Sequence, residues 1–395
     1  MRKPLAGTST GASAHSRACL GAAARNHLVR EGHLLTVRIE ERVPTGNPDL
    51  LALLPDTPLA RISTPLPQPH PGFWAKLECV SVGGMKARAA LSMLAGARHR
   101  AELRPGAPVV ESTSGTLGLG LAFAGQALGH PVVLVVDREL EAGMRALLRA
   151  HGARIEVVDR PHPVGGWQQA RLDRVRELCR ELPGAYWPDQ YNNPDNPAGY
   201  AALGEEIVHQ LGAADVLVCS VGSGGHSAGT IRALRRHWPS IRLVGVDTVG
   251  STIFGQPARP RVMRGLGSSI HPRNVDYAQF DEVHWVGPAE AVQACRTLAE
   301  RSFVSGGWST GAVALVSAWV ARVEAGARVV TVFPDGPHRY LHTIFDDDFC
   351  RARGLIDTPV ATRPVEIAHP RLDEVEGWAR CRAVLDPLSL VEVPA

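Results

Sequence analysis

The chain has 395 residues, of which 45% are apolar and 21% are charged, and its formal net charge is +3. A chain of this length can bury one large hydrophobic core or two cooperating ones, and this composition is typical of a soluble globular enzyme. The small net charge argues against a nucleic-acid partner, and no apolar run approaches the roughly 18 residues that a membrane helix needs. The 7 cysteines include no C-x-x-C pair, which favours a reduced, cytoplasmic location and indicates no metal site.

The beginning of the chain differs in composition from the rest. Its first 30 residues are rich in Ala, Ser and Arg and contain no acidic residue. We expect residues 1–34 to form a loose N-terminal head. An organelle transit peptide has a similar composition and is the alternative, whereas a secretory signal is excluded because an apolar core is missing.

Short apolar runs alternate with helical patterns between about residues 35 and 350. The runs contain Val, Leu and Ile without alternating polar residues, which is typical of strands buried on both faces. Strands that alternate with helices predict a mostly parallel α/β sheet with right-handed crossovers. The predicted strands are 109–110, 132–136, 155–158, 216–219, 243–246 and 329–333. The predicted helices are about 87–103, 116–128, 141–151, 167–182, 198–211, 227–238, 288–302, 310–324 and 339–350.

Two segments interrupt or end this alternation. Residues 187–197 are polar and dense in Pro and Asn, which predicts a crossover between two halves of the chain. After residue 353 the periodicity fades, and we expect a tail that contains several prolines.

Three glycine turns, each opening onto a helix, contain the residues with catalytic potential. The first, 82–88, places Lys86 at the start of an Ala-rich helix, where an amine can capture an aldehyde or ketone. The second, 111–115, presents hydroxyl groups that suit a carboxylate, and the third, 222–229, suits a phosphate dianion. Taken singly, a solvated lysine, an N-cap and a tight turn are the alternatives. Together, the three turns indicate an enzyme that uses pyridoxal phosphate.

The motifs, in their order along the chain, resemble those of the cysteine synthase and cystathionine β-synthase family of fold-type II pyridoxal-phosphate enzymes. The resemblance covers about residues 55–350. It rests on the segments Thr57-Pro58-Leu59, Lys76-Leu77-Glu78, Gly83 to Arg88, Glu111 to Gly118, Gln190 to Pro197, Gly222 to Gly229, Val244-Gly245-Val246, Gly265-Leu266-Gly267, Trp308 to Ala312, and Pro334-Asp335 with Arg339 to Leu341.

The resemblance implies a fold and a division into domains. The fold is that of the tryptophan synthase β subunit, with two three-layer α/β domains and mostly parallel sheets. A large cofactor-binding domain would comprise residues 35–86 and 190–350, and a small mobile domain would comprise residues 87–189. Residues 351–395 would form a C-terminal extension.

The resemblance also implies roles for single residues. Lys86 would bind pyridoxal phosphate as a Schiff base and later move the Cα proton of the substrate. The other residues expected to bind the cofactor are Thr116, Gly222, Ser223, Gly224, Gly225, His226, Ser227 and Gly336. Those expected to bind the amino-acid substrate are Thr113, Ser114, Gly115, Gln190, Gly265 and Gly267.

Several positions depart from the family pattern. Thr116 replaces an Asn beside the 3′ oxygen of the cofactor, His226 replaces a Thr of the phosphate loop, and Ala87 replaces an Asp. Gly336 falls where we expect the family serine that bonds the pyridine nitrogen. These changes predict a ring nitrogen without a side-chain partner, which suits elimination of a good leaving group better than racemisation or transamination.

These inferences predict a β-replacement synthase that acts on an activated serine, such as O-acetylserine or O-phosphoserine, through an enzyme-bound aminoacrylate. A sulfur or amine nucleophile would then add at Cβ, and the departures favour specialised metabolism over housekeeping cysteine synthesis. A β-eliminating lyase or dehydratase of serine-like or threonine-like substrates is one alternative, and a regulatory protein that binds the cofactor without catalysis is another. We expect a cytoplasmic homodimer that binds small molecules and has no nucleic-acid or membrane partner.

Overall fold

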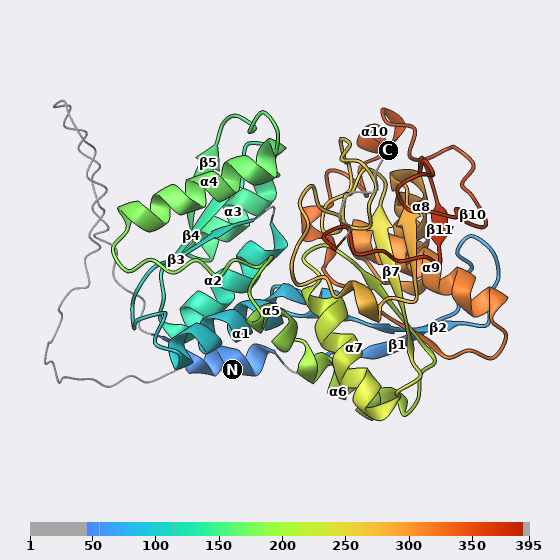
Figure 1. The fold of residues 1–395 in the computed structure, drawn as a ribbon, viewed down its shortest axis with the longest axis horizontal. Coiled ribbons are helices and arrows are strands. Elements are labelled where there is room, and N and C mark those ends of the chain that lie inside the picture. Colours follow the sequence, from blue (N-terminus) through green and yellow to red (C-terminus); the bar gives the residue numbers. More distant parts are fainter. Residues whose placement is uncertain (1–45, 55, 114, 390–395) are drawn as a thin grey trace, which may run out of the picture. The chain divides into compact units, whose positions relative to one another are not determined.

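The computed structural model describes residues 46–54, 56–113 and 115–389. The expected N-terminal head and the candidate substrate-binding residue Ser114 lie outside these ranges. Two β-sheets, one of three strands and one of eight, organise the described residues (Figure 1). Both sheets are mostly parallel, which confirms the predicted α/β class.

The smaller sheet and its helices come from the first half of the chain. They comprise β3 (Val109–Ser112), β4 (Val132–Asp137), β5 (Arg154–Val158), α1 (Lys86–His99), α2 (Thr116–Leu128), α3 (Ala142–Ala150) and α4 (Gly166–Glu181). Val110, Val133 and Val135 pack with apolar side chains of α4 on one face. Leu134 points to the other face and belongs to a core that includes Leu148 of α3. Burial on both faces explains why β4 is an almost continuous apolar run.

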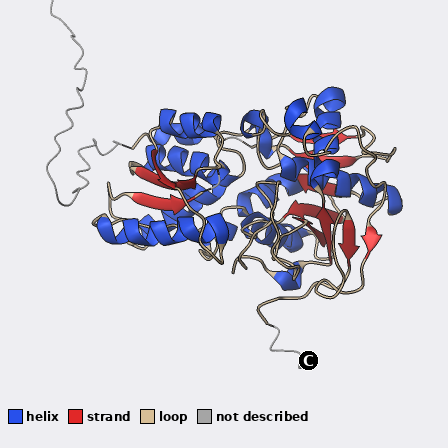
Figure 2. Ribbon diagram, turned by 90° about the horizontal axis from the view of Figure 1, so that it is seen from above, coloured by secondary structure: helices blue, strands red, loops and turns tan. Residues whose placement is uncertain are grey.

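The larger sheet has the strand order β1-β2-β9-β6-β7-β8-β11-β10, and its central strands from β2 to β8 are parallel. Helices α8 and α9 cover one face, whereas α6 and α7 cover the other, and Figure 2 shows helices on both sides of the strands. The strands are β1 (Leu59–Ile62), β2 (Phe73–Lys76), β6 (Val216–Ser220), β7 (Arg242–Thr248), β8 (Glu282–Val286), β9 (Val329–Val332), β10 (Val365–Glu366) and β11 (Ala379–Cys381). The helices are α6 (Ala201–Leu211), α7 (Gly225–His237), α8 (Pro288–Ser302) and α9 (Trp308–Val323).

Short helical segments connect these elements. They are η1 (Pro48–Leu53), η2 (Glu78–Val80), α5 (Asp195–Ala198), η3 (Tyr277–Gln279), η4 (Pro337–Arg339) and α10 (Asp347–Arg351). The helix predicted over residues 339–350 is therefore wrong, because η4 and α10 are separated by turns. Asp346 explains where α10 begins, since its carboxylate accepts a hydrogen bond from the Phe349 N–H at 2.7 Å.

The six predicted strands are all present, whereas β1, β2 and β8 were not predicted. These three strands contain charged or aromatic residues, so they lack the continuous aliphatic run that identifies a buried strand. Most predicted helices agree with the structure, and the one predicted over 198–211 is divided between α5 and α6.

The C-terminal extension contributes strands to the larger sheet instead of forming a separate tail. Strand β11 pairs antiparallel with β8, and β10 pairs with β11 at the edge. Buried Arg380 donates through Nε to Glu282 at 2.9 Å, and the indole of Trp378 donates to His284 Nδ1 at 3.2 Å. Because both contacts reach β8, they hold the extension against the sheet.

Three further properties follow from the described residues. None of the helices in these ranges has the length and apolar character that a membrane span requires. The six cysteines found there carry free thiols. No group of three or more His, Cys, Asp or Glu side chains within these ranges is placed to hold a metal ion.

Candidate active site

Lys86 is the first residue of α1 and follows a tight glycine turn, as the sequence predicted. Gly84 has a φ of +61°, and a Cβ atom there would lie 2.8 Å from the carbonyl oxygen of Pro334. The Met85 N–H donates to the same oxygen at 2.9 Å. The turn therefore ties the start of α1 to the segment after β9, which fixes where the Lys86 side chain begins.

The Lys86 amine has a single hydrogen-bond partner among the described residues. Its Nζ donates to Ser223 Oγ at 3.2 Å. Burial lowers the pKa of Lys86 to about 8, and the negative charge of Asp335 opposes this only in part. An amine with this pKa loses its proton more readily than an ordinary lysine, and the neutral form is the one that attacks an aldehyde.

The loop between β6 and α7 has the geometry of an anion-binding helix start. Gly224 has a φ of +81°, and a Cβ atom there would lie 2.5 Å from the backbone nitrogen of Val275, so only glycine fits. A Cβ atom on Gly222 would have no neighbour closer than 3.5 Å, which leaves this side of the loop open. Free N–H groups and the dipole of the helix that follows favour a phosphate at this position.

The side chains of His226 and Ser227 in this loop contact other groups of the protein. His226 is buried, and burial together with the charge of Lys86 lowers its pKa to about 3, so the ring is neutral. The ring packs edge-to-face with Tyr200, with centroids 6.0 Å apart. Ser227 Oγ donates to the Gly224 carbonyl at 3.0 Å. Backbone N–H groups, more than these side chains, are therefore what the loop offers to an anion.

The loop between β3 and α2 combines a helix cap with a polar lining. Thr113 Oγ1 accepts from the N–H groups of Gly115 and Gly118 at 3.0 and 3.2 Å, which is the N-cap alternative that the sequence left open. Its O–H remains available to a ligand. Gln190 Nε2 donates to a backbone carbonyl of β3 at 3.3 Å, which places this amide beside the same loop.

A cavity of about 80 Å³ brings the three glycine turns together. The predicted residues that line it are Lys86, Thr113, Thr116, Gln190, Gly222, Ser223, Gly265 and Gly267. Leu117, Tyr191 and Arg339 also line it and were not predicted. The predicted residues Gly115, Gly224, Gly225, His226, Ser227 and Gly336 are not part of its wall.

Gly336, which the sequence predicted beside the cofactor, is not part of the cavity wall. A Cβ atom built there would be 2.9 Å from the carbonyl oxygen of Cys79 and 3.3 Å from His338 Nδ1. Ser309, at the start of α9, instead has its Oγ 3.0 Å from a Cβ atom built on the cavity residue Gly265. The hydroxyl in segment 308–312 was the signal in the sequence that could have identified Ser309.

A buried carboxylate, Asp335, lies beside the same end of the cavity. Its Oδ2 accepts hydrogen bonds from Thr116 Oγ1 at 3.0 Å and from the Tyr340 hydroxyl at 2.6 Å, whereas Oδ1 has no partner among the described atoms. Burial and the Asp335 charge raise the pKa of Tyr340 well above its ordinary value, so this hydroxyl stays protonated. The Thr116 side chain is thus held in place by a negative charge.

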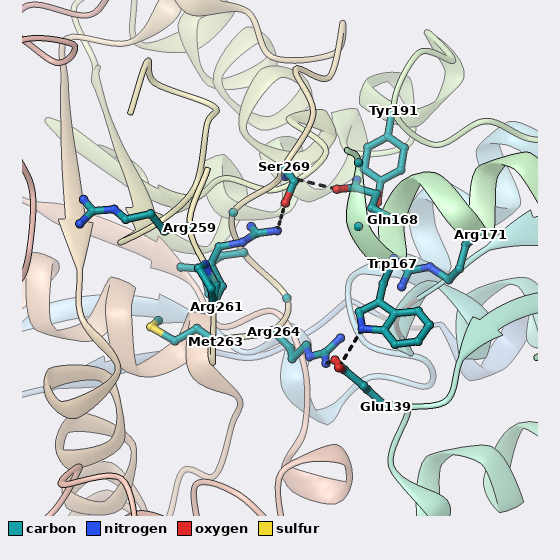
Figure 3. A pocket seen from close by; sticks show the side chains of 16 residues that line it. Glu139, Trp167, Gln168, Arg171, Tyr191, Arg259, Arg261, Met263, Arg264 and Ser269 are labelled. Carbon is teal, nitrogen blue, oxygen red and sulfur yellow. Dashed lines mark hydrogen bonds and ion pairs between the residues drawn. The ribbon is translucent and has the colours of Figure 1, made fainter. Parts of the chain in front are cut away.

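A second cavity, of about 440 Å³, adjoins the first and shares Tyr191, Gly265 and Gly267 with it. Side chains from α4 and from the segment 259–269 face one another across it (Figure 3). The part of its wall that the structure describes contains the arginines Arg171, Arg259, Arg261 and Arg264. Glu139 also lines this cavity, so the wall carries charges of both signs.

Comparison with known proteins places these features in a family. The sequence profile of the family described as "Pyridoxal-phosphate dependent enzyme" matches residues 51–335. The chain is 35% identical to the N-(2-amino-2-carboxyethyl)-L-glutamate synthase of Ralstonia nicotianae, over 81% of this chain and 96% of that protein. It is 36% identical to the protein of the same name from Cupriavidus metallidurans, over 74% of this chain and 88% of that protein.

Among solved structures, the O-acetylserine-dependent cystathionine β-synthase of Helicobacter pylori is similar to this chain. The TM-score is 0.69 at 30% sequence identity, and the match covers 74% of this chain and 97% of that one. The match agrees with the family resemblance of the motifs and with the predicted fold.

Proposed function

The chain belongs to the family of pyridoxal-phosphate-dependent enzymes, and we propose that it is a β-replacement synthase that acts on an activated serine. The observation that carries this proposal is the Lys86 amine, which lies 3.2 Å from the Ser223 hydroxyl at the open side of a glycine loop. The names of both relatives describe the attachment of a 2-amino-2-carboxyethyl group to an amino acid. Such a group corresponds to serine that has lost its hydroxyl oxygen.

The residues of the site fit the family cofactor. Gly224 leaves no room for a side chain, and the open loop offers N–H groups to a phosphate. Lys86 provides an amine with a lowered pKa in the wall of the same cavity. When bound there, pyridoxal phosphate supplies an aldehyde that bonds an amine and a ring that withdraws electrons from Cα.

We propose that two hydroxyl groups contact the ring of this cofactor. We assign Ser309, in place of Gly336, to the ring nitrogen, because its Oγ faces Gly265 whereas position 336 faces Cys79. Thr116 is assigned to the 3′ oxygen, and its bond to Asp335 orients its hydroxyl. A serine at the ring nitrogen replaces the expectation that this atom has no side-chain partner.

Lys86 is the residue that we propose to hold and move the proton at Cα of the substrate. Its lowered pKa means that the neutral amine, which accepts a proton, and the ammonium, which returns one, are both present near pH 8. Ser223 Oγ accepts from this amine and from the Asn196 side chain at 3.3 Å, so its own hydrogen is directed elsewhere.

The serine donor is proposed to bind through its carboxylate. The O–H of Thr113 and the amide of Gln190 lie in the cavity wall near the start of α2, where the helix dipole favours a negative charge. Gly265 and Gly267 line the opposite side and leave space for the group on Cβ.

We propose an amine of an amino acid as the nucleophile. The two relatives are named for a bond between the transferred group and L-glutamate, and an amine must enter past the arginines of the larger cavity.

The assembly and location of the protein are further parts of the proposal. We propose a cytoplasmic homodimer in which residues 87–189 form a small domain that moves relative to residues 35–86 and 190–350. Light scattering of the purified protein tests the dimer, and a change of small-angle scattering on adding a serine donor tests the motion.

Mass spectrometry of reaction products tests the activity. The purified holoenzyme is incubated with O-acetylserine or O-phosphoserine and with L-glutamate, other amines, or sulfide. The expected product with L-glutamate carries a 2-amino-2-carboxyethyl group on its nitrogen. Release of pyruvate and ammonia with every nucleophile would instead support the eliminating lyase.

A further inference from the structure

The four arginines of the larger cavity differ in their ionic partners. Three of them form an ion pair with a carboxylate. These pairs are Arg171 with Asp137, Arg259 with Glu374 at 3.3 Å, and Arg264 with Glu139 at 2.8 Å. The carboxylates compensate these three positive charges, so none of the three requires a ligand.

Arg261 is the exception. In the described part of the chain it has no carboxylate oxygen within 4.0 Å, and its Nη2 donates to Ser269 Oγ at 3.1 Å (Figure 3). Burial lowers the pKa of Arg261, the charge of Asp247 and then Tyr191 oppose this in part, and the charges of Arg264 and Arg171 lower it further. A partly buried guanidinium without a paired anion is unfavourable, and its free N–H groups can bind one.

The position of Arg261 separates it from the donor site. It lines the larger cavity, whereas Lys86, Thr113 and Gln190 line the smaller one. It nevertheless reaches the junction of the two cavities, because a Cβ atom on Gly267 would lie 2.6 Å from Arg261 Nη1. An anionic group held by Arg261 would therefore belong to a molecule that extends from the junction toward the entrance.

We propose that Arg261 binds a carboxylate of the incoming nucleophile and thereby selects an amino acid over a small thiol or a simple amine. This inference rests on the proposed β-replacement. Arg261 is a specificity residue: it holds the nucleophile by its carboxylate, and the amine remains free to point through the junction toward Lys86. A planar guanidinium can hold a carboxylate through two parallel hydrogen bonds, which also fixes the orientation of the molecule.

The phosphate of O-phosphoserine is a second oxyanion that Arg261 could meet. It would reach the junction from the smaller cavity, attached to the donor. The two sources are distinguished by the choice of donor, because O-acetylserine carries no phosphate. An effect of Arg261 on L-glutamate that persists with O-acetylserine belongs to the nucleophile.

The test compares Arg261→Gln with Arg259→Gln, which removes a paired arginine from the same cavity. With O-acetylserine as donor, Arg261→Gln is expected to raise the KM for L-glutamate roughly 10- to 100-fold, with a much smaller change in kcat. The KM of Arg261→Gln for sulfide, which has no carboxylate, is expected to stay within about twofold of that of the unmodified enzyme. In the control variant Arg259→Gln, the KM for L-glutamate and the KM for sulfide are both expected to stay within the same range. Arg261→Lys should restore part of the affinity for L-glutamate, because the charge is kept and the two parallel bonds are lost.

Three results would overturn the inference. They are an equal loss with sulfide, an equal loss in Arg259→Gln, and an effect confined to the KM for O-phosphoserine. Calorimetric binding of L-glutamate to the holoenzyme gives a readout that does not depend on turnover. Binding that requires Arg261 without any β-replacement would remove the proposed function, and with it the role of L-glutamate as nucleophile, whereas β-replacement that is independent of Arg261 would keep the function and overturn the inference.

Discussion

Lys76, at the end of β2, and Lys86, at the start of α1, are both enclosed by protein but have different surroundings. Lys76 is completely buried, and its Nζ contacts Glu206 at 2.6 Å, the Thr57 carbonyl at 2.6 Å and Gln210 at 2.9 Å. Lys86 is partly buried, lines a cavity and contacts only Ser223 among the described residues. The two amines therefore differ in charge compensation: Lys76 has a paired carboxylate and Lys86 has none among the described residues, which suits the reactive role proposed for Lys86.

The partner of Lys76 also explains why that lysine is structural. Glu206 contacts Arg88 at 2.6 Å as well, and Arg88 in turn contacts Glu78 at 2.8 Å. Although burial opposes it, hydrogen bonds from Arg88 and Lys76 lower the pKa of Glu206, so the carboxylate stays charged. The network connects β2, α1 and α6, and it therefore supports the turn that carries Lys86.

The comparison fails most clearly if Lys86 is not the residue that binds the cofactor. Lys86→Ala is expected to lower the β-replacement rate by roughly 10⁴-fold, because both the attachment of the cofactor and the proton transfer are lost. Borohydride reduction of the unmodified holoenzyme followed by peptide mapping should find the cofactor on Lys86. A label on Lys76 would contradict this assignment.

The opposite change should affect stability instead of chemistry. Lys76→Met is expected to destabilise the protein by about 3 kcal/mol, because it removes one cation from a buried network. Denaturant unfolding measures the loss, and the visible absorption of the folded holoenzyme should remain unchanged. Lys76→Met combined with Glu206→Gln should recover part of the stability; if the double variant loses as much as the sum of the single changes, the two residues are not coupled.

Lys86 should also make the stability of the cofactor-free protein depend on pH. The pKa of Lys86 is about 8 in the folded protein and 10.5 ordinarily, so its buried charge destabilises the cofactor-free protein below pH 8. This penalty is relieved as the pH rises from about 8 to 10.5, because only the unfolded chain then keeps the proton. Lys86→Met should therefore stabilise the cofactor-free protein at pH 7, in contrast to Lys76→Met.

The rate of cofactor capture gives an independent check of that pKa. Capture by the cofactor-free protein should increase up to about pH 8 and then level off, because the neutral amine is the reactive form. Stopped-flow absorbance measures this rate. Asp335→Asn should move the profile to lower pH, since the Asp335 charge favours the ammonium form of Lys86. A profile that still rises at pH 10 would mean that Lys86 is solvated like an ordinary lysine.

The smallest expected effect comes from the neutral partners of the two amines. Ser223→Ala should weaken cofactor binding about fivefold, because one hydrogen bond in the phosphate loop is lost. Gln210→Ala, which removes a neutral partner of Lys76, should leave cofactor affinity unchanged. Equilibrium dialysis of both variants compares them, and equal weakening would indicate that the Lys76 network reaches the cofactor site.

Much of the fold could be predicted because its signals are local. Continuous apolar runs identified the strands that are buried on both faces, including β4 and β6. Strands β1 and β2 escaped prediction, because they mix apolar residues with charged ones. The pairing of β1 with β2, and of β2 with β9, is what makes them part of the sheet. The C-terminal strands β10 and β11 also escaped prediction, because β8, with which β11 pairs, is distant in the sequence.

The site shows the same division. The glycine turns around Lys86, Thr113 and Ser223 were predictable, because a turn of this kind requires glycine and opens a helix at a fixed distance along the chain. Ser309 and Asp335 could not be distinguished from neighbouring polar residues by local pattern. Their position at the cavity depends on how α9 and the segment after β9 pack against the turn of Gly84.

The sequence by itself thus determined the fold class and the glycine turns that open helices, including the one that carries Lys86, because each depends on short-range periodicity or backbone conformation. Only the tertiary structure decided that the charge of Lys76 is compensated by a carboxylate and that of Lys86 is not. It also decided that Arg261, among the arginines in the described wall of the larger cavity, is the one without a carboxylate partner. Charge compensation depends on which side chains meet across elements far apart in the chain. Long-range packing sets those distances, and a local sequence pattern does not contain them.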